Sequence, residues 1–105
     1  MLVRESAPLL GFKLLNYMNK TILGTISILI KDRHNKSAGV NELLTKESRL
    51  IRARLGVNVE PKCAAGCLAV ISLVVEGEEK EINDLTKKLN DLSGVKAGNY
   101  LMLSE

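Results

Sequence analysis

The 105-residue chain has no tryptophan, and its only aromatic residues are Phe12, Tyr17 and Tyr100. Proteins that bind single-stranded nucleic acid stack bases on aromatic side chains, and three dispersed rings cannot form such a platform. Hydrophobic residues nevertheless make up 46% of the sequence. Any core must therefore be aliphatic, and the length suits one compact domain.

Long apolar runs are also missing. A helix that crosses a bilayer needs roughly 20 apolar residues, whereas the strongest candidates, residues 22–30 and 68–75, are strand-length and contain serine, threonine or glycine. The leucines near the N-terminus are not followed by the small-residue cleavage site of a secretory signal. We therefore expect a cytoplasmic protein without a membrane-spanning segment.

Metal-ligating residues are few, because the chain has one histidine, His34, and two cysteines, Cys63 and Cys67. A structural zinc site normally has four ligands, so the two cysteines would need His34 or a second subunit to complete one. The Cys-x-x-x-Cys spacing leaves three alternatives open: the thiols bind a soft metal, close a disulfide or are inert. No other cofactor is indicated.

Charge is modest and unevenly distributed. The formal net charge is +3, with basic residues concentrated in the first half and glutamates clustered at residues 76–81. Neither a dense basic stripe nor a helix-turn-helix is visible, so we do not expect direct DNA binding. No nucleophile with a general base, paired carboxylates or phosphate-binding glycine loop is visible either, which indicates that the protein is not an enzyme.

The first half of the pattern predicts strand, helix, strand. Residues 22–30 alternate with isoleucines on one side. After a cap at Asn35 or Ser37, a helix is predicted with Ala38, Asn41 and Leu44 on its packed stripe and Val40 and Leu43 beside them. Residues 50–59 alternate again, placing Ile51, Ala53, Leu55, Val57 and Val59 on one face.

The second half repeats this order. Residues 68–75 form a strand that is apolar on both faces, residues 82–92 have helical spacing, and a last strand begins at Val95, with Gly98 marking a bulge or a close approach. Two right-handed crossovers then give an α+β ferredoxin-like βαββαβ sandwich, a four-stranded antiparallel sheet with two helices on one face. We assign residues 21–105 to this domain and residues 1–20 to an N-terminal extension, either disordered or a short helix.

The other face of this sheet would be left uncovered. Because the strand at residues 68–75 is apolar there too, and monomers rarely expose so large an apolar patch, we expect a homo-oligomer, a dimer or a tetramer. In residues 50–59 the alternation also places Arg52 and Arg54 on one side, where they would bind an anion or form salt bridges at an interface.

Five short motifs in order resemble the family of iron-only hydrogenase system regulators: Asp32-Arg33, Val40-Asn-Glu-Leu-Leu44, Arg54-Leu-Gly-Val57, Ile71-Ser-Leu-Val-Val-Glu-Gly77 and Leu89-Asn-Asp-Leu-Ser-Gly-Val95. The resemblance implies an ACT-like form of the ferredoxin-like fold, related to the C-terminal domain of the nickel-responsive repressor, and a role in regulation without a catalytic activity. The histidine-rich nickel site of those relatives has no counterpart here, because this chain has only His34.

The expected function is that of a regulatory domain, a transcriptional regulator of a hydrogenase-type system that oligomerises and holds a small effector between subunits. ACT domains that bind amino acids often have a glycine after the acidic residue ending the first strand, but here Arg33 follows Asp32. We place the effector-binding residues at Asp32, Arg33, His34, Asn35, Gly94 and Gly98. The alternatives are a thiol-based metal or redox sensor using Cys63 and Cys67, and a protein–protein interaction module without a ligand.

Overall fold

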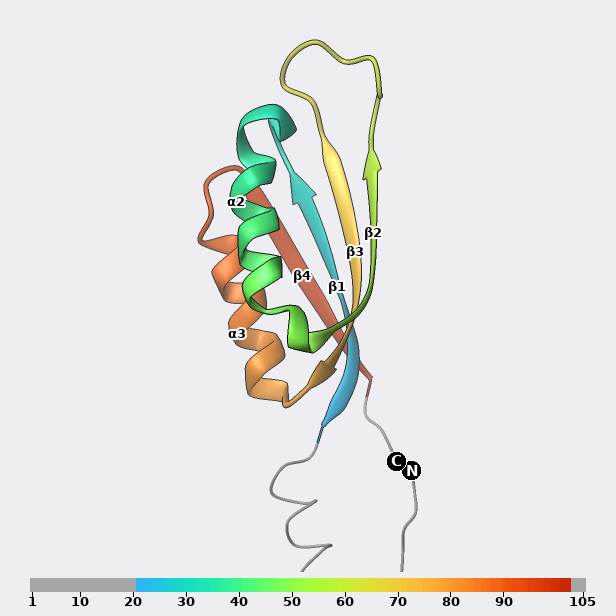
Figure 1. Cartoon of the computed structure of the whole chain (residues 1–105), viewed down its shortest axis with the longest axis vertical. Coiled ribbons are helices and arrows are strands. Elements are labelled where there is room, and N and C mark those ends of the chain that lie inside the picture. The colour runs from blue at the N-terminus through green and yellow to red at the C-terminus, as the bar shows by residue number, and fades with distance from the viewer. Residues whose placement is uncertain (1–20, 103–105) are drawn as a thin grey trace, which may run out of the picture.

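The protein is described here by a computed structural model in which residues 21–102 are placed (Figure 1). The predicted extension, residues 1–20, lies outside the described residues, so the division of the chain stays a prediction. The elements follow the predicted order, with one short 3-10 helix added: β1 (Ile22–Ile30), α2 (Arg33–Lys46), η1 (Ser48–Leu50), β2 (Ile51–Asn58), β3 (Ala69–Gly77), α3 (Glu79–Asn90) and β4 (Val95–Met102).

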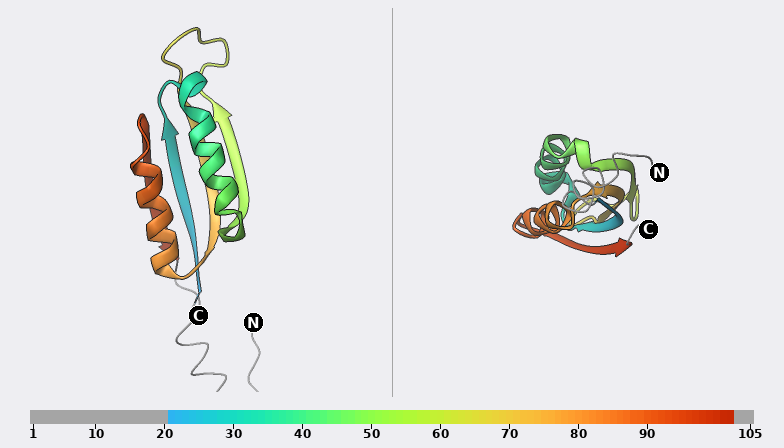
Figure 2. Two further views of the ribbon diagram at one scale, coloured as in Figure 1. Left: turned by 60° about the vertical axis from the view of Figure 1, so that its left-hand side comes forward. Right: turned by 90° about the horizontal axis from the view of Figure 1, so that it is seen from below.

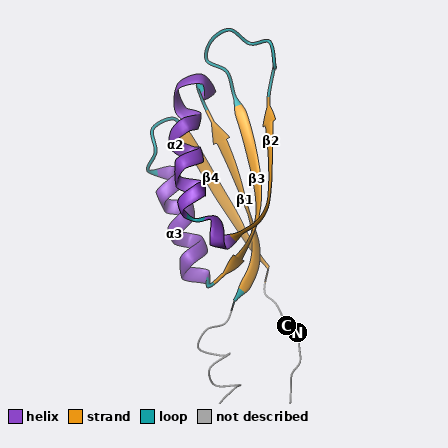
Figure 3. Cartoon of the chain, in the orientation of Figure 1, coloured by secondary structure: helices purple, strands orange, loops and turns teal. Residues whose placement is uncertain are grey.

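The four strands form one sheet in the order β2-β3-β1-β4, and each neighbouring pair is antiparallel. Both helices lie against the same face of this sheet, as the two views of Figure 2 and the colouring of Figure 3 show. The predicted α+β ferredoxin-like βαββαβ fold is therefore confirmed. We call the sheet face opposite the helices the free face.

The core lies between the sheet and the two helices. Ile26, Ile28 and Ile30 of β1 point into it and are almost completely buried, as the alternation of isoleucines predicted. The helices contribute five buried aliphatic residues, Val40, Leu44, Ile82, Leu85 and Leu89. Full burial of a side chain of this size contributes about 1.5–3 kcal/mol, so this aliphatic layer is the main source of stability.

Helix α2 begins earlier than predicted, and a different stripe of it is buried. It starts at Arg33 because Asp32 has a positive φ of 56° and its carbonyl oxygen accepts the N–H groups of Asn35 and Lys36, both at 3.0 Å. The predicted cap at Asn35 or Ser37 is therefore wrong. Ala38 and Asn41, expected on the packed stripe, are exposed, whereas the neighbouring Val40 and Leu44 are buried.

A β-bulge at the start of β2 changes which residues share a face. Ile51 pairs with the buried Val75, but Ala53 pairs with the exposed Val74. Directly opposed residues of an antiparallel pair lie on the same face of the sheet, so Ile51 lies on the core side and Ala53 on the free face. The prediction that both share a face is wrong, because the bulge inserts one extra residue between them.

Gly98 was predicted to mark a bulge or a close approach in the last strand, and the structure has neither there. Gly98 pairs with Ser27 in an unbroken register, and a Cβ at this position would meet no atom within 4 Å. Neither described helix is both long and apolar enough to cross a bilayer.

Candidate functional site

Two side chains of the turn after β1 are hydrogen-bonded to each other. The Asn35 side-chain amide donates to both carboxylate oxygens of Asp32, at 2.9 and 3.2 Å. His34 is exposed at the start of α2. Of the four predicted effector-binding residues in this turn, Asp32 and Asn35 are thus bound to each other, and His34 faces solvent.

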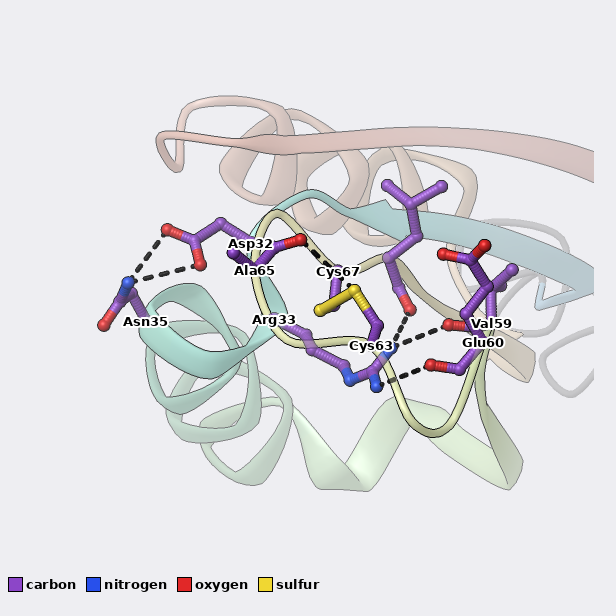
Figure 4. Close-up of a disulfide and its surroundings, with 9 residues drawn as sticks. Asp32, Arg33, Asn35, Val59, Glu60, Cys63, Ala65 and Cys67 are labelled. Carbon is purple, nitrogen blue, oxygen red and sulfur yellow. Dashed lines mark hydrogen bonds between the residues drawn. A yellow bond between two sulfur atoms is a disulfide. The ribbon is translucent and has the colours of Figure 1, made fainter.

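Arg33, the fourth of these residues, is buried, with 7% of its surface exposed. Its guanidinium donates to three backbone carbonyls, those of Val59 at 2.9 Å, Leu68 at 2.6 Å and Glu60 at 3.1 Å (Figure 4). These carbonyls belong to the two arms of the loop between β2 and β3. Arg33 therefore joins the start of α2 to that loop and is not presented to solvent.

The two predicted glycines lie in different places. Gly94 has a φ of 77°, its carbonyl oxygen accepts the N–H of Lys31 at 2.8 Å, and a Cβ there would lie 3.3 Å from Lys36 Cγ. Gly94 is thus packed against the β1–α2 turn. Gly98 lies further along β4, opposite Ser27. The fold therefore brings five of the predicted effector-binding residues to one turn and leaves Gly98 apart from them.

Arg52 and Arg54 do not form a pair. Arg52 lies in the bulge and bonds the Glu76 carboxylate at 3.1 Å, whereas Arg54 donates to the side-chain oxygen of Asn41 on α2. Alternation predicted that both guanidinium groups share one side, and the bulge separates them. Arg52 thus reaches a neighbouring strand and Arg54 a helix, so an anion site made from both is not assembled in this structure.

Cys63 and Cys67 form a disulfide, which is one of the three alternatives that the sequence left open for these residues. Their Cα atoms are 5.8 Å apart, within the usual range for a disulfide. Cys67 is fully buried and Cys63 is half-buried. Within residues 21–102, no group of three or more histidine, cysteine, aspartate or glutamate side chains is arranged to hold a metal ion.

The free face of the sheet carries exposed apolar side chains on all four strands. The most exposed are Leu55 and Tyr100, at 65% and 68%, and the set also includes Leu23, Val57, Val74 and Met102. Pairing across the strands places these residues on the side opposite the helices. Sequence reasoning predicted an apolar open face but named none of them as site residues. That prediction came from the strand at residues 68–75, whereas the alternation of residues 95–102 is the signal that could have identified Tyr100 and Met102.

The centre of the free face is lower than its rim. Thr25, Ser27 and Ser72 are small and lie side by side in the register of β1 and β3, whereas Leu55 and Val74 stand next to them. Together these residues line a shallow hollow of about 460 Å³. A large side chain of a binding partner could enter this hollow, so the face offers both protruding groups and a place to receive them.

A charged cluster lies at the end of the helix layer that is away from the β1–α2 turn, where η1 meets the start of α3. The Glu81 carboxylate accepts the Glu78 N–H at 3.0 Å and pairs with Arg49. The hydrogen bond from Arg49, followed by that from the Glu78 backbone, lowers the pKa of Glu81 below its ordinary value. This cluster ties η1 to the start of α3 and is structural in character.

Known families and solved structures resemble this chain in the way that the sequence motifs indicated. A family model described as "TM1266-like: Iron-only hydrogenase system regulator, putative" matches residues 22–98. The structure of the uncharacterized protein TM1266 from Thermotoga maritima is similar with a TM-score of 0.70 and 29% sequence identity, covering 78% of this chain and 98% of that chain.

A second solved structure is that of CPII, a nitrogen regulatory PII-like protein from Thiomonas intermedia K12, bound to ADP, AMP and bicarbonate. Its TM-score is 0.43 at 19% identity, covering 79% of this chain and 98% of that chain. None of the curated proteins matches the chain. Since the family model spans well over half of the sequence, the chain belongs to the TM1266-like family of iron-only hydrogenase system regulators.

Proposed function

We propose that this chain is a non-catalytic regulatory domain of a hydrogenase-type system that works by associating with further copies of itself through the free face. The family description supports the regulatory role. The exposed apolar set on the free face supports the association, and it is the observation that carries the proposal. Monomeric soluble proteins rarely expose many large apolar side chains on one face.

A second copy is the occupant that best fits this surface. A twofold interface uses the same patch on both subunits, so the patch must complement itself. The free face has this property, because it combines the protruding Leu55 and Tyr100 with the hollow over Thr25, Ser27 and Ser72. Its formal charges lie toward the ends of the strands, at the Arg52–Glu76 pair and at Lys96.

The effector belongs to the same proposal. We place it beside the β1–α2 turn and Gly94, where the assembled subunits would complete a pocket that one subunit does not enclose. Regulation of transcription would then require a partner protein to contact DNA, since residues 21–102 form no recognisable DNA-reading element. A cytoplasmic location is part of the proposal and rests on the sequence alone.

The association is tested by measuring the molar mass of the full chain by light scattering at micromolar concentration. The unchanged protein is expected to be a dimer or tetramer, and Leu55→Glu is expected to be a monomer, because it places a charge in the middle of the interface. Ala38→Glu adds the same charge to the exposed side of α2 and is expected to leave the assembly intact. A stable monomer of the unchanged protein would contradict the proposal.

The effector is tested separately by thermal unfolding of the folded protein with amino acids, nucleotides and divalent cations. A ligand at one hundred times its dissociation constant stabilises the native state by about 2.7 kcal/mol, which for a domain of this size raises the melting temperature by roughly ten degrees. A specific shift would identify the class of effector. No shift with any compound would contradict the effector step and favour a module that responds to a protein partner.

A further inference from the structure

The disulfide lies in the loop between β2 and β3 and links no distant parts of the chain. Cys63 and Cys67 are only four positions apart, while β2 and β3 are already joined by their own ladder from Ile51 to Asn58. A disulfide that closes so short a loop constrains the unfolded chain less than one that closes a long loop. Holding the fold together is therefore a poor explanation for this bond.

The two sulfur atoms differ in accessibility. Cys67 is 1% exposed, whereas Cys63 is half-buried and lines an open hollow with Glu60, Pro61 and Lys62. A thiolate from outside can thus approach the Cys63 sulfur and not the Cys67 sulfur. Thiol–disulfide exchange depends on which sulfur can be attacked, and the more exposed Cys63 is the better target, with Cys67 as the leaving group.

The residue that carries the buried sulfur also contacts Arg33. The carbonyl oxygen of Cys67 accepts the Arg33 backbone N–H at 2.8 Å, and the next carbonyl, that of Leu68, accepts the Arg33 guanidinium at 2.6 Å. We call Arg33 with its carbonyl acceptors on Val59, Glu60, Cys67 and Leu68 the Arg33 clamp. Figure 4 shows the disulfide directly beside it.

We propose that Cys63–Cys67 is a thiol–disulfide exchange site for a dithiol reductant, and that its redox state sets how firmly the Arg33 clamp holds the β2–β3 loop. In the reducing cytoplasm, where the proposed function places this chain, disulfides are usually transient, catalytic or redox-sensing. This disulfide closes a short loop, is partly accessible at Cys63 and lies next to the buried Arg33. These are features of a redox-sensing disulfide.

The chemistry balances with the reductant alone. A thiolate of the dithiol attacks the Cys63 sulfur, the Cys63–Cys67 bond breaks, and the Cys67 sulfur leaves as a thiolate that takes up a proton. The second thiol of the reductant then gives up its proton and attacks the mixed disulfide, releasing Cys63 as a thiolate that is protonated. Two electrons and two protons pass to the protein, and the dithiol becomes a cyclic disulfide, so the reverse reaction restores the starting state.

The loop already contains an acceptor for the reduced Cys63. Its sulfur lies 3.2 Å from the carbonyl oxygen of Ala65. A disulfide sulfur has no proton to donate, so in the oxidised protein this is only a contact, whereas a thiol can make it a hydrogen bond. Reduction therefore gives Cys63 a partner within the loop and removes the covalent tie that keeps Cys67 next to Arg33.

The consequence for association rests on the proposed function. Val57 lies near the end of β2 and Val59 is the first residue of the loop that follows it. The Val59 N–H donates to the Leu68 carbonyl at 3.1 Å. When the clamp loosens, this end of β2 loses its fixed position, and the adjoining part of the free face with it. Reduction is therefore expected to weaken the assembly at least several-fold.

The test treats the full chain with reduced or oxidised dithiothreitol, counts reactive thiols and records hydrogen–deuterium exchange. Reduction is expected to convert zero thiols per chain into two and to speed exchange of the Arg33 and Val59 amides at least tenfold, while amides in α3 stay unchanged. A Cys63→Ser, Cys67→Ser double variant should exchange like the reduced protein under both conditions. Two free thiols in the oxidised sample, or a reduction that leaves both amides equally protected, would overturn the proposal.

Failure of this proposal and failure of the proposed function give different results. Thiol number and loop exchange are properties of the single chain, so they test the exchange site even if the unchanged protein is a monomer. Light scattering of the same samples reads the assembly separately. Loop release without a change in molar mass would remove the link to association and leave the exchange site standing.

Discussion

The Nη1 of Arg33 lies 2.6 Å from the carbonyl oxygen of Leu68, which ties the first residue of α2 to the residue that precedes β3. Within residues 21–102, no carboxylate forms an ion pair with this buried guanidinium. Backbone carbonyls take that role, and hydrogen bonds to a charged donor are stronger than those between neutral groups. The position of the β2–β3 loop thus depends on one side chain that lies 26 to 35 positions earlier in the sequence.

Replacing Arg33 by methionine should destabilise the protein. The carbonyls of Val59 and Glu60 would lose their donor while remaining partly buried, and each lost bond of this kind costs on the order of 1–3 kcal/mol. We expect the free energy of unfolding in urea to fall by about 2 kcal/mol. Arg54→Met, which removes one exposed bond to Asn41, should change it by less than about 0.5 kcal/mol. Equal urea midpoints for the two variants would show that the clamp is not stabilising.

Gly94 and Gly98 provide a matched pair of substitutions. Gly94→Ala should cost about 1–2 kcal/mol, because alanine is disfavoured at a φ of 77°. Gly98→Ala should be neutral or stabilise by up to about 1 kcal/mol, since a Cβ there meets no atom within 4 Å and alanine is preferred over glycine in a strand. Thermal unfolding of both variants distinguishes them. A harmless Gly94→Ala would contradict the left-handed backbone conformation of Gly94.

Local patterns were enough to predict the order of the four strands and the two α-helices. The isoleucines of β1 and the series Ile82, Leu85 and Leu89 of α3 are buried as their spacing indicated, because each periodicity is a property of a short stretch of chain. From the number and order of these stretches the ferredoxin-like topology followed. The apolar character of the open sheet face also followed, since alternate residues of a strand face opposite sides.

Features that depend on distant partners could not be predicted in this way. Arg33 follows a strand and precedes polar residues, and the sequence placed it among the effector-binding residues. Its backbone acceptors at Val59 and Leu68 lie 26 and 35 positions away, so no local pattern indicates them. The bulge between Ile51 and Ala53 is set by pairing with β3 and leaves no local signal. Both features involve predicted site residues, whose contacts depend on how distant elements meet.

Stability should depend on pH through Glu81. The bond from Arg49 lowers the pKa of Glu81 in the folded state, so its contribution is fully present above the pKa of an unfolded glutamate, about 4.3, and is lost as pH falls through the lower folded-state pKa. Glu81→Gln should therefore destabilise the protein at pH 7, by on the order of 1 kcal/mol, and the difference should shrink toward pH 3. Urea unfolding at both pH values measures this.

The control for that experiment is Glu42→Gln, because Glu42 is an exposed carboxylate of α2 with no ion pair among the described residues. Its removal changes the net charge by the same amount, so it separates the specific bond from general charge effects. A pH-independent loss of stability in Glu81→Gln would instead assign the effect to packing at the start of α3.

Leu73 and Leu55 lie on neighbouring strands and opposite faces of the sheet, and they should respond differently to truncation. Leu73 is 1% exposed, so Leu73→Ala should cost about 2–5 kcal/mol through lost burial and a cavity. Leu55 is 65% exposed in the single chain, so Leu55→Ala removes few contacts that stabilise a monomer.

If the free face is covered by a second copy, the stability of the unchanged protein rises with protein concentration, and Leu55→Ala reduces that dependence. Thermal unfolding over a hundredfold range of concentration makes the comparison. A melting temperature of the unchanged protein that stays constant over this range would mean that no second copy covers Leu55, and the free face would then have to bind something other than a further copy of this chain.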